Sequence, residues 1–448
     1  MKILSITAQK PHSTGSGVYL TELVNAFDRL GHSQAVIAGI CKEDTVHFPD
    51  RVSFFPVYYQ SASLPFPVAG MSDEMPYEST RYRDMTPEMT GQFCRSFSAS
   101  IIDSVRSFQP DLIICHHLYL LTALVRELLP SQKTAACSSY AEPGRLCQTF
   151  SGNAAPVRPF RRVIAGICHG SDLRQIKKNP LLRQEIIEQI RNLDVIFCLH
   201  REQGAEIIRT FSCSPRLVKV LGTGFNSQIF HRLPDVSRAA PAVCGDSSRP
   251  VRLLFAGKIS EKKGVMSLLR ALRLLPSSLS ERLSLTLAGG HGNEEEYKEI
   301  LDLASPELGC PCPVRFAGRL SQTELAQLMN GSDIFVLPSF YEGLPLVLAE
   351  SLACGMKTVC TDLPGIRPWM DENLPGHGTS FVAPPPMENE DEPVKAALPA
   401  FESALARAIE KASALSCPPL AASHELRESL ARLSWDGAAE RLLQAVPV

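Results

Sequence analysis

Long apolar runs are missing from this sequence, which limits the classes of protein it can belong to. No stretch of the 448-residue chain approaches the roughly 18 continuous apolar residues of a membrane-spanning helix, and Leu118–Val125, among the longest, already contains Thr122. The opening MKILSITAQKP turns polar too soon for a secretory signal and is typical of a first β-strand. We therefore expect a cytoplasmic protein, whose only membrane contact would be peripheral, at the inner face.

A strong charge of either sign is also absent. The 45 basic and 47 acidic residues leave a formal net charge of -2, which gives no bulk attraction to nucleic acid. Basic residues outnumber acidic ones locally, from Arg158 to Lys219, where core-facing positions interrupt them. We interpret this segment as a solvated face, with attraction to anionic lipid or to a phosphorylated acceptor as the alternative. No nucleic-acid partner is expected.

Paired metal ligands are scarce, although the chain has 14 cysteines. Cys310 and Cys312 come closest, but no second Cys or His pair lies at zinc-ligand spacing from them. Several other cysteines lie inside apolar, strand-like runs, where a free cysteine behaves as a small buried hydrophobic residue. This pattern fits a reducing cytosol, and we expect neither a metal site nor a cofactor.

Short apolar, β-branched runs alternate with segments of helical period along most of the chain. This alternation is the signature of βα units and of a parallel sheet covered on both faces. The first series of expected strands is Ile3–Ala8, Gln34–Ala38, Val52–Val57, Leu112–Cys115, Val163–Cys168, Val195–Leu199 and Val218–Leu221. The second is Arg252–Ala256, Ser284–Ala288, Val314–Ala317, Ile334–Leu337, Thr358–Thr361 and Ser380–Val382. The sequence thus predicts an α/β protein with two Rossmann-like, parallel-sheet domains.

The chain length suits two domains of roughly 200 residues each. Residues 233–250 are rich in Pro, Ser and Ala and lack a period, so we place a linker there, after a first domain of residues 1–232. Two stretches depart from the βα alternation, Tyr59–Thr90 and Cys137–Arg162, and at least part of each is expected to be a mobile surface loop. We interpret the acidic, proline-rich Pro384–Pro393 as a solvated loop. Helices are expected at 396–413 and 423–446.

The most informative run is SFYEGLPLVLAESLACGMKTVCTDLPG, at Ser339–Gly365. It follows an expected strand and places a loop before a helix that begins about Leu344 and Pro345. The free backbone N–H groups and positive dipole end of such a helix favour an anion, for which diphosphate is the natural candidate. Glu342 in this loop and Glu350, two turns along the helix, could accept hydrogen bonds from vicinal hydroxyls. The alternatives are a dipole partner and a solvated charge.

This run resembles glycosyltransferase family 4 of the GT-B fold, whose hallmark is a Glu-x7-Glu pair, matched here by Glu342 and Glu350. The resemblance extends in order through LLFAGKISEKKGV, LTLAGGHG, VRFAGRLSQTEL and TDLPG. It implies two Rossmann-like domains facing a central cleft, the second at 251–420. The last helix, at 421–448, resembles the family helix that packs back on the first domain, with Trp435 as its anchor.

The resemblance also assigns roles in the second domain. It gives the ribose hydroxyls to Glu350 and the transferred sugar to Glu342. Lys263 matches a lysine that stabilises the departing diphosphate, and Lys258 stands where the family has arginine, which keeps the charge but loses the bidentate fork. The remaining donor-binding positions are the backbones of Gly257, Gly343, Leu344 and Leu346.

A second polar cluster is expected in the first domain. Gly15 and Gly17 follow the first strand and precede a helix, where their amides could meet a phosphate or an acceptor, and the resemblance places the donor there. His116 and His117 end one strand, and the sequence His-Gly-Ser-Asp at 169–172 follows another. Ligands of open α/β sheets bind beyond such strand ends, so these polar residues are acceptor-side candidates. We give His169 a catalytic role and group Asp172 with the acceptor side. The sequence leaves open which histidine contacts substrate, and a structural role fits at least one.

The resemblance implies a retaining, hexosyltransferase-like enzyme that moves a sugar from a nucleotide sugar, most commonly a UDP-sugar, to a small-molecule, lipid or glycan acceptor. The absence of any Asp-x-Asp sequence agrees with Lys258 and Lys263 replacing a divalent metal. The acceptor-specific parts would be the two departures from βα alternation. Two alternatives remain: a catalytically silent nucleotide-sugar-binding subunit that regulates a partner, and a GT-B sugar-nucleotide epimerase.

Overall fold

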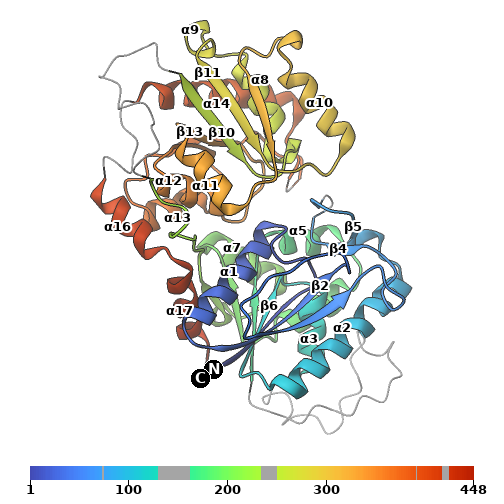
Figure 1. Ribbon diagram of the computed structural model, residues 1–448. Coiled ribbons are helices and arrows are strands. Elements are labelled where there is room, and N and C mark those ends of the chain that lie inside the picture. The colour runs from blue at the N-terminus through green and yellow to red at the C-terminus, as the bar shows by residue number, and fades with distance from the viewer. Residues whose placement is uncertain (73–74, 130–161, 234–249, 390, 416–422, 448) are drawn as a thin grey trace. The chain divides into compact units, whose positions relative to one another are not determined.

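The computed structural model describes residues 1–72, 75–129, 162–233, 250–389, 391–415 and 423–447 (Figure 1). The chain forms two compact units. Unit 1 comprises Met1–Thr223 and Trp435–Val448, and unit 2 comprises Gly224–Ser434. In the described ranges, no helix is both long and apolar enough to cross a membrane. Each unit is an α/β structure around its own parallel sheet.

Unit 1 is built on a seven-stranded sheet in the order β3-β2-β1-β6-β7-β8-β9, with every neighbouring pair parallel. The strand order reverses between β1 and β6, as in other doubly wound sheets. Its strands are β1 Lys2–Thr7, β2 Ser33–Ile40, β3 Val52–Tyr58, β6 Leu112–His116, β7 Val163–Ile167, β8 Val195–Cys198 and β9 Val218–Val220. Its helices are α1 Gly15–Arg29, α2 Pro87–Phe108, α3 Leu120–Leu128, α5 Ser171–Lys178, α6 Arg183–Ile190, α7 Arg201–Phe211 and α17 Trp435–Ala445.

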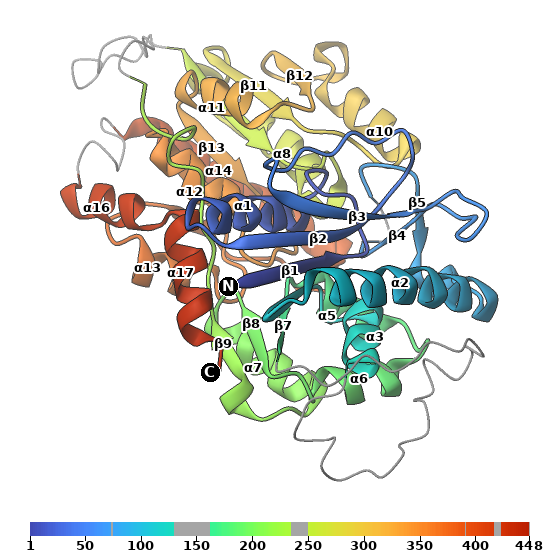
Figure 2. The same cartoon turned by 60° about the horizontal axis from the view of Figure 1, so that its bottom comes forward.

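Both faces of this sheet are covered, as the alternation along β2 shows. Ala35 and Ile37 belong to the large core that α2, α3 and α5 to α7 help to form. Val36, Ala38 and Ile40 point the other way and pack with Leu20 and Val24 of α1. Figure 2 shows α1 beside β2. Because successive side chains of a strand alternate between faces, a strand covered on both faces is apolar at nearly every position.

Unit 2 has a six-stranded sheet in the order β12-β11-β10-β13-β14-β15, again parallel throughout. Its strands are β10 Val251–Ala256, β11 Leu283–Ala288, β12 Val314–Gly318, β13 Ile334–Leu337, β14 Lys357–Thr361 and β15 Ser380–Val382. Its helices are α8 Val265–Leu272, α9 Ser277–Ser280, α10 Glu294–Ala304, α11 Gln322–Asn330, α12 Leu346–Ala353, α13 Ile366–Asn373, α14 Leu398–Ala414 and α16 His424–Arg432. The prediction of an α/β fold with two Rossmann-like parallel-sheet domains is confirmed.

Every strand expected from the sequence is present, with ends that agree within two residues. The stretch Tyr59–Thr90 is more ordered than a loop. It contains the parallel strands β4 Val68–Gly70 and β5 Ser79–Arg81, and its Tyr59 and Leu64 are fully buried. Apart from Arg162, the second departure, Cys137–Arg162, lies outside the described residues.

The prediction of one helix over 423–446 is wrong, because the helical segment breaks between α16 and α17. Ser434 forms a parallel bridge with Phe225, and the Phe225 amide donates to the Leu433 carbonyl at 3.3 Å. Those backbone groups therefore take part in the bridge and not in a continuous helix. Beyond the break, α17 packs on α1 within unit 1, where Trp435 meets the edge of Tyr19 with ring centroids 4.8 Å apart.

The two units divide at Thr223 and Gly224, earlier than the sequence boundary at 232. The intervening residues pack with unit 2: the Asn330 side chain donates to the His231 carbonyl at 2.9 Å and accepts from the Leu233 amide at 2.9 Å. Asn330 is itself buried, so both of its amide groups need partners. The end of the predicted first domain is therefore fixed by a buried side chain of the second.

Candidate functional site

The polar groups of unit 2 gather where β10 and β13 end. The loop after β10 carries Lys258 and then the short helix Glu261–Lys263, and Gly264 closes this turn with φ +70°. A Cβ on Gly264 would lie 2.0 Å from the Pro338 carbonyl oxygen, just after β13. Only glycine combines this left-handed conformation with so close an approach. The two loops are therefore held against each other at their backbones.

An ion pair joins the same two loops at their side chains. Lys263 Nζ lies 2.6 Å from Glu342 Oε1, and the Ser339 hydroxyl donates to the same carboxylate oxygen at 2.8 Å. Lys263 also donates to the Tyr341 carbonyl at 3.4 Å. Both charged side chains stay partly exposed, at 28% and 14%. The structure thus brings together two of the residues that the resemblance placed in catalysis.

Helix α12 begins at Leu346 and has Pro345 as its N-cap, slightly later than the expected start at Leu344 and Pro345. Within the described part of the chain, the amides of Gly343, Leu344 and Leu346 donate to no protein acceptor. Open N–H groups ahead of a helix are the groups that bind phosphate in other proteins. These three predicted donor-binding residues are therefore placed together and available.

Glu350 lies in the second turn of α12 and its side chain is largely buried, at 8% exposure. On an otherwise apolar helix such a carboxylate is not the solvated charge that the sequence left open.

Lys258 and Gly257 follow directly after β10, where Lys258 is half-buried and Gly257 is exposed. Burial, together with the charges of Glu342 and Asp362, raises the pKa of the Cys360 thiol in β14 well above its ordinary value.

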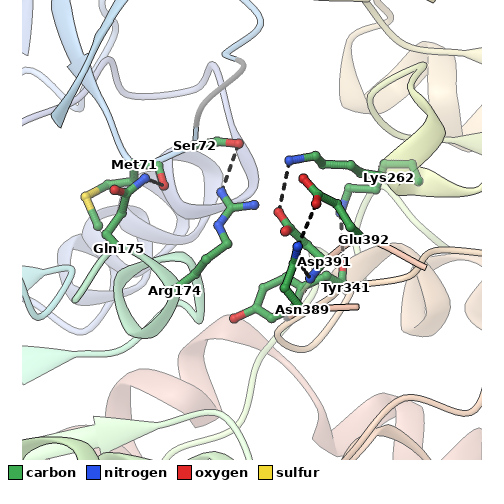
Figure 3. A network of polar contacts seen from close by, with 10 residues as sticks. Met71, Ser72, Arg174, Gln175, Lys262, Tyr341, Asn389, Asp391 and Glu392 are labelled. Carbon is green, nitrogen blue, oxygen red and sulfur yellow. Dashed lines mark hydrogen bonds and ion pairs between the residues drawn. The ribbon is translucent and has the colours of Figure 1, made fainter. Parts of the chain in front are cut away.

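Pro384–Pro393 is only in part the solvated loop that its composition predicts, since Glu388 and Glu392 are exposed but Asp391 is not. Its Asp391 side chain is fully buried and lies 3.0 Å from Lys262 Nζ (Figure 3). The Asn389 side chain accepts from the Asp391 amide at 3.1 Å and donates to Glu392 at 2.6 Å. Since Lys262 adjoins Lys263, this acidic loop anchors the turn that carries the candidate catalytic lysine. Composition could not reveal this, because the partner lies 129 positions away.

In unit 1 the glycines lie inside α1 and not before it, which corrects the sequence prediction. Thr14 is the N-cap and its hydroxyl accepts from the Gly17 amide at 3.1 Å. A Cβ on Gly17 would lie 2.9 Å from the Lys10 carbonyl oxygen, whereas one on Gly15 would meet nothing within 4 Å. Between them, the Ser16 hydroxyl lies 3.1 Å from His117 Nε2. The helix start is thus tied to the end of β6.

The three candidate histidines form one group, which we call the histidine cluster (His116, His117 and His169). His116 and His169 stack with an interplanar angle of 11°, and His116 Nδ1 lies 3.1 Å from His169 Nε2. The His117 ring lies 4.8 Å from the His169 ring. Tyr19 and His169 form a T-shaped pair with ring centroids 5.1 Å apart, and Tyr19 donates its hydroxyl to the Gly222 carbonyl. Sequence reasoning missed Ser16 and Tyr19, because helical periodicity was their only local signal.

Burial keeps the histidine cluster uncharged. It lowers the pKa of His116 to about 3 and the pKa values of His117 and His169 below the ordinary value, and neighbouring rings lower those of His116 and His169 further. His117 has φ +73°, a conformation rarely adopted by a residue with a side chain. Strain of this kind is concentrated at functional sites. The cluster is therefore a constrained, neutral group.

Asp172 is completely buried and directs its carboxylate at the protein. It accepts from the Leu118 amide at 2.8 Å, the His169 amide at 3.3 Å and the Cys168 thiol at 3.3 Å. It thereby connects the loops after β6 and β7. Among the acceptor-side candidates, Asp172 thus has a structural role, because it holds the backbone beside His117 and at His169.

Residues 242–398 match the model of the family described as glycosyl transferases group 1. D-inositol 3-phosphate glycosyltransferase of Streptomyces bingchenggensis is 31% identical over 191 residues, which are 41% of this chain and 42% of that protein. The chain therefore spans less than half the length of this curated relative. The matched segment contains every candidate donor-binding residue of unit 2.

Solved structures match over nearly the whole chain. Sucrose-phosphate synthase of Thermosynechococcus elongatus has a TM-score of 0.66 at 17% identity, covering 99% of this chain and 98% of its own. HepE of Anabaena, solved in complex with UDP and glucose, has a TM-score of 0.63 at 15% identity, covering 99% and 98%. Residues 242–398 are thus similar in sequence to group 1 glycosyltransferases, and the chain as a whole has the GT-B fold.

Proposed function

We propose that the protein is a glycosyltransferase that moves a sugar from a nucleotide sugar to an acceptor. The observation that carries the proposal is the Lys263–Glu342 pair at the start of α12, where open amides can receive a diphosphate. The match of residues 242–398 to group 1 glycosyltransferases supports it. UDP is the proposed nucleotide, because the Anabaena protein with the same fold was solved with UDP and glucose.

In this proposal unit 2 binds the donor. The amides of Gly343, Leu344 and Leu346 hold the diphosphate, with Gly257 allowing close approach after β10. Lys263 and Lys258 neutralise the charge that develops on the diphosphate as it leaves. Glu342 accepts from hydroxyls of the transferred sugar and Glu350 from the ribose.

We propose that the sugar is transferred with retention of configuration. The acceptor hydroxyl attacks from the face that the nucleoside diphosphate vacates, so that one C–O bond forms as the sugar–phosphate bond breaks. The proton of the acceptor passes to a phosphate oxygen, and no nucleophile of the protein takes part. The protein accelerates the transfer by positioning the reactants and by stabilising the charge on the leaving group. The positive charges of Lys258 and Lys263, proposed to act on the leaving diphosphate, support a reaction without a divalent metal.

Unit 1 provides the proposed acceptor groups, which are those of the histidine cluster, while Gly15 and Gly17 of α1 keep their proposed role at the donor. The curated relative from Streptomyces bears the name of an inositol phosphate, so a phosphorylated polyol is the first acceptor class to test. Lipid and glycan acceptors follow. We keep the expectation that any membrane contact is peripheral.

The test is release of nucleoside diphosphate from a panel of nucleotide sugars with EDTA present, with and without pooled acceptors. Glu350→Ala should abolish release, whereas Glu299→Ala, an exposed glutamate on α10, should leave it unchanged. Release from one donor that an acceptor stimulates would support the transferase. A strict requirement for Mn²⁺ or Mg²⁺ would contradict the metal-independent mechanism.

Two other results would replace the proposal. Tight nucleotide binding without release from any donor would indicate a silent binding subunit. Interconversion of the donor sugar without acceptor and without release would indicate an epimerase. The same panel, analysed by chromatography of the sugars, distinguishes all three.

A further inference from the structure

Two ring nitrogens of the histidine cluster, His116 Nε2 and His117 Nδ1, are buried without a partner in the described chain, and the one on His116 bears on His169. His116 Nε2 makes no hydrogen bond, and the His116 side chain is 3% exposed. Its other nitrogen, Nδ1, faces His169 Nε2 at 3.1 Å. Buried polar atoms without partners are rare in proteins, so the position of the protons on these two rings needs an explanation.

Two neutral imidazoles that share one hydrogen bond have two possible proton arrangements. In the first, His116 Nδ1 donates to His169 Nε2, and His169 carries its own proton on Nδ1. In the second, His169 Nε2 donates to His116 Nδ1, and the His116 proton then sits on Nε2. A neutral imidazole has one N–H donor and one acceptor nitrogen, so no third arrangement keeps this hydrogen bond.

The environment of His116 Nε2 decides between them. The second arrangement buries an N–H group with no acceptor, while the first leaves only a lone pair there. Buried N–H groups without an acceptor are the rarer of the two defects. On the His169 side the cost is equal in both, because His169 is half-buried and its Nδ1 forms no hydrogen bond with any described residue. That nitrogen can meet water in either form.

We infer that His116 is a positioning residue that donates from Nδ1 to His169 Nε2 and thereby fixes His169 in the tautomer protonated at Nδ1. His169 then presents an N–H donor and not a lone pair at its open nitrogen. The remaining contacts keep the His169 ring in place: Tyr19 packs against it in a T-shaped pair, His117 also packs against it, and Asp172 accepts from the His169 backbone amide.

This tautomer limits what His169 can do, and the consequence rests on the proposed function. A protonated Nδ1 cannot take a proton from an acceptor hydroxyl. It can donate a hydrogen bond to an oxygen lone pair, and so orient the hydroxyl whose proton goes to the phosphate. His169 thus becomes a residue that orients an oxygen of the acceptor or the sugar, and His116 sets the direction of that bond.

The tautomer is measured by NMR on the full chain with ¹⁵N-labelled histidine. Two-bond ¹H–¹⁵N correlations separate protonated ring nitrogens from unprotonated ones. The His169 signals are assigned by their loss in His169→Gln and, independently, by through-bond transfer from its backbone. We expect a protonated Nδ1 and a bare Nε2 in the wild-type protein. A protonated Nε2, or two tautomers in exchange, would overturn the inference.

A matched pair of variants separates the hydrogen bond from the stacking. His116→Phe keeps a stacked ring without a donor, and His116→Asn keeps an N–H donor near the place of Nδ1. The phenylalanine variant should shift His169 toward the Nε2 tautomer and lower kcat/KM for the acceptor by roughly two- to tenfold, the range of a single hydrogen bond, with the nucleotide Kd unchanged. The asparagine variant should keep the wild-type tautomer. Equal tautomers in both variants would overturn the role of His116.

Failure of the inference and failure of the proposed function are distinguishable. The tautomer is read without substrate, so the expected spectrum with no turnover from any donor would remove the transferase and keep His116 as the residue that fixes His169. Turnover together with the opposite tautomer would do the reverse.

Discussion

Replacing Asp391 by asparagine tests whether the acidic loop after β15 is part of the structure of unit 2. Asp391 is fully buried, and Lys262 keeps 30% of its side chain exposed. Breaking a fully buried pair costs about 3–5 kcal/mol, and an exposed pair contributes less than about 1 kcal/mol. With one buried and one partly exposed partner, we expect Asp391→Asn to lower the free energy of unfolding by about 2 kcal/mol. For a unit of this size the melting temperature would fall by about 4–8 °C.

The two tryptophans make the assay specific. Trp369 lies in unit 2 and Trp435 in unit 1, both buried. In a Trp435→Phe background, fluorescence during urea unfolding reports unit 2 through Trp369 alone. The midpoint should fall in the Asp391→Asn variant while the urea dependence stays the same, since the surface exposed on unfolding does not change.

An exposed ion pair of the same unit provides the matched control. Arg367 and Asp362 are closer, at 2.6 Å, but are 46% and 31% exposed. Asp362→Asn should therefore cost less than about 1 kcal/mol. An equal or larger loss in this variant than in Asp391→Asn would refute the argument that burial, and not distance, sets the value of the pair.

Three further predictions concern both units. Lys263→Met should lower kcat by about 10²-fold or more, because a group that stabilises charge on the leaving diphosphate is lost. Circular dichroism should show an intact fold, and an unchanged kcat would mean that Lys263 takes no part in catalysis. Gly17→Ala should lower the free energy of unfolding of unit 1 by about 1–3 kcal/mol, because the added methyl group meets backbone atoms. Gly15→Ala places its methyl group in open space and should be neutral or stabilising by about 0.5–1 kcal/mol. Thermal melts measure both, and the opposite order of stability would contradict the packing. Burial lowers the pKa of His116 to about 3, so below the ordinary histidine pKa near 6.5 this side chain is protonated in the unfolded chain but not in the folded one. The free energy of unfolding should therefore fall as the pH falls from about 6.5 toward about 3. At pH 5 the loss from this residue is about 2 kcal/mol, measurable as Trp435 fluorescence during urea unfolding, and His116→Phe should remove it; a pH-independent midpoint would contradict the burial.

The fold was predictable from the sequence because buried parallel strands have a recognisable local sequence pattern. A strand covered on both faces, such as β2, is apolar at nearly every position, and no distant partner is needed to recognise it. The candidate donor residues were predictable for a similar reason, since Glu342 and Glu350 lie in one short run. The assignment of Lys263 to the same site came from the family resemblance, because Lys263 lies on another loop far away in the chain; its ion pair with Glu342 was not predicted.

What the sequence missed depends on contacts between distant residues. The burial of Asp391 follows from Lys262 on another loop, and a composition rich in Pro and Glu predicts a solvated segment instead. The break before α17 depends on the bridge between Ser434 and Phe225, although helical periodicity continues across it. The bond between His116 and His169 also arises only when β6 and β7 lie side by side.

The return of α17 to unit 1 has a consequence for how the chain folds during synthesis. Unit 1 takes residues from both sides of unit 2, and Trp435 covers Tyr19 beside the histidine cluster. A chain emerging from the ribosome therefore completes unit 2 while the ring of Tyr19 still lacks its cover. Domains generally fold as units, the N-terminal one first, but here unit 1 is complete only after unit 2 has been synthesised. Docking of α17 is the step that closes the structure around the histidine cluster.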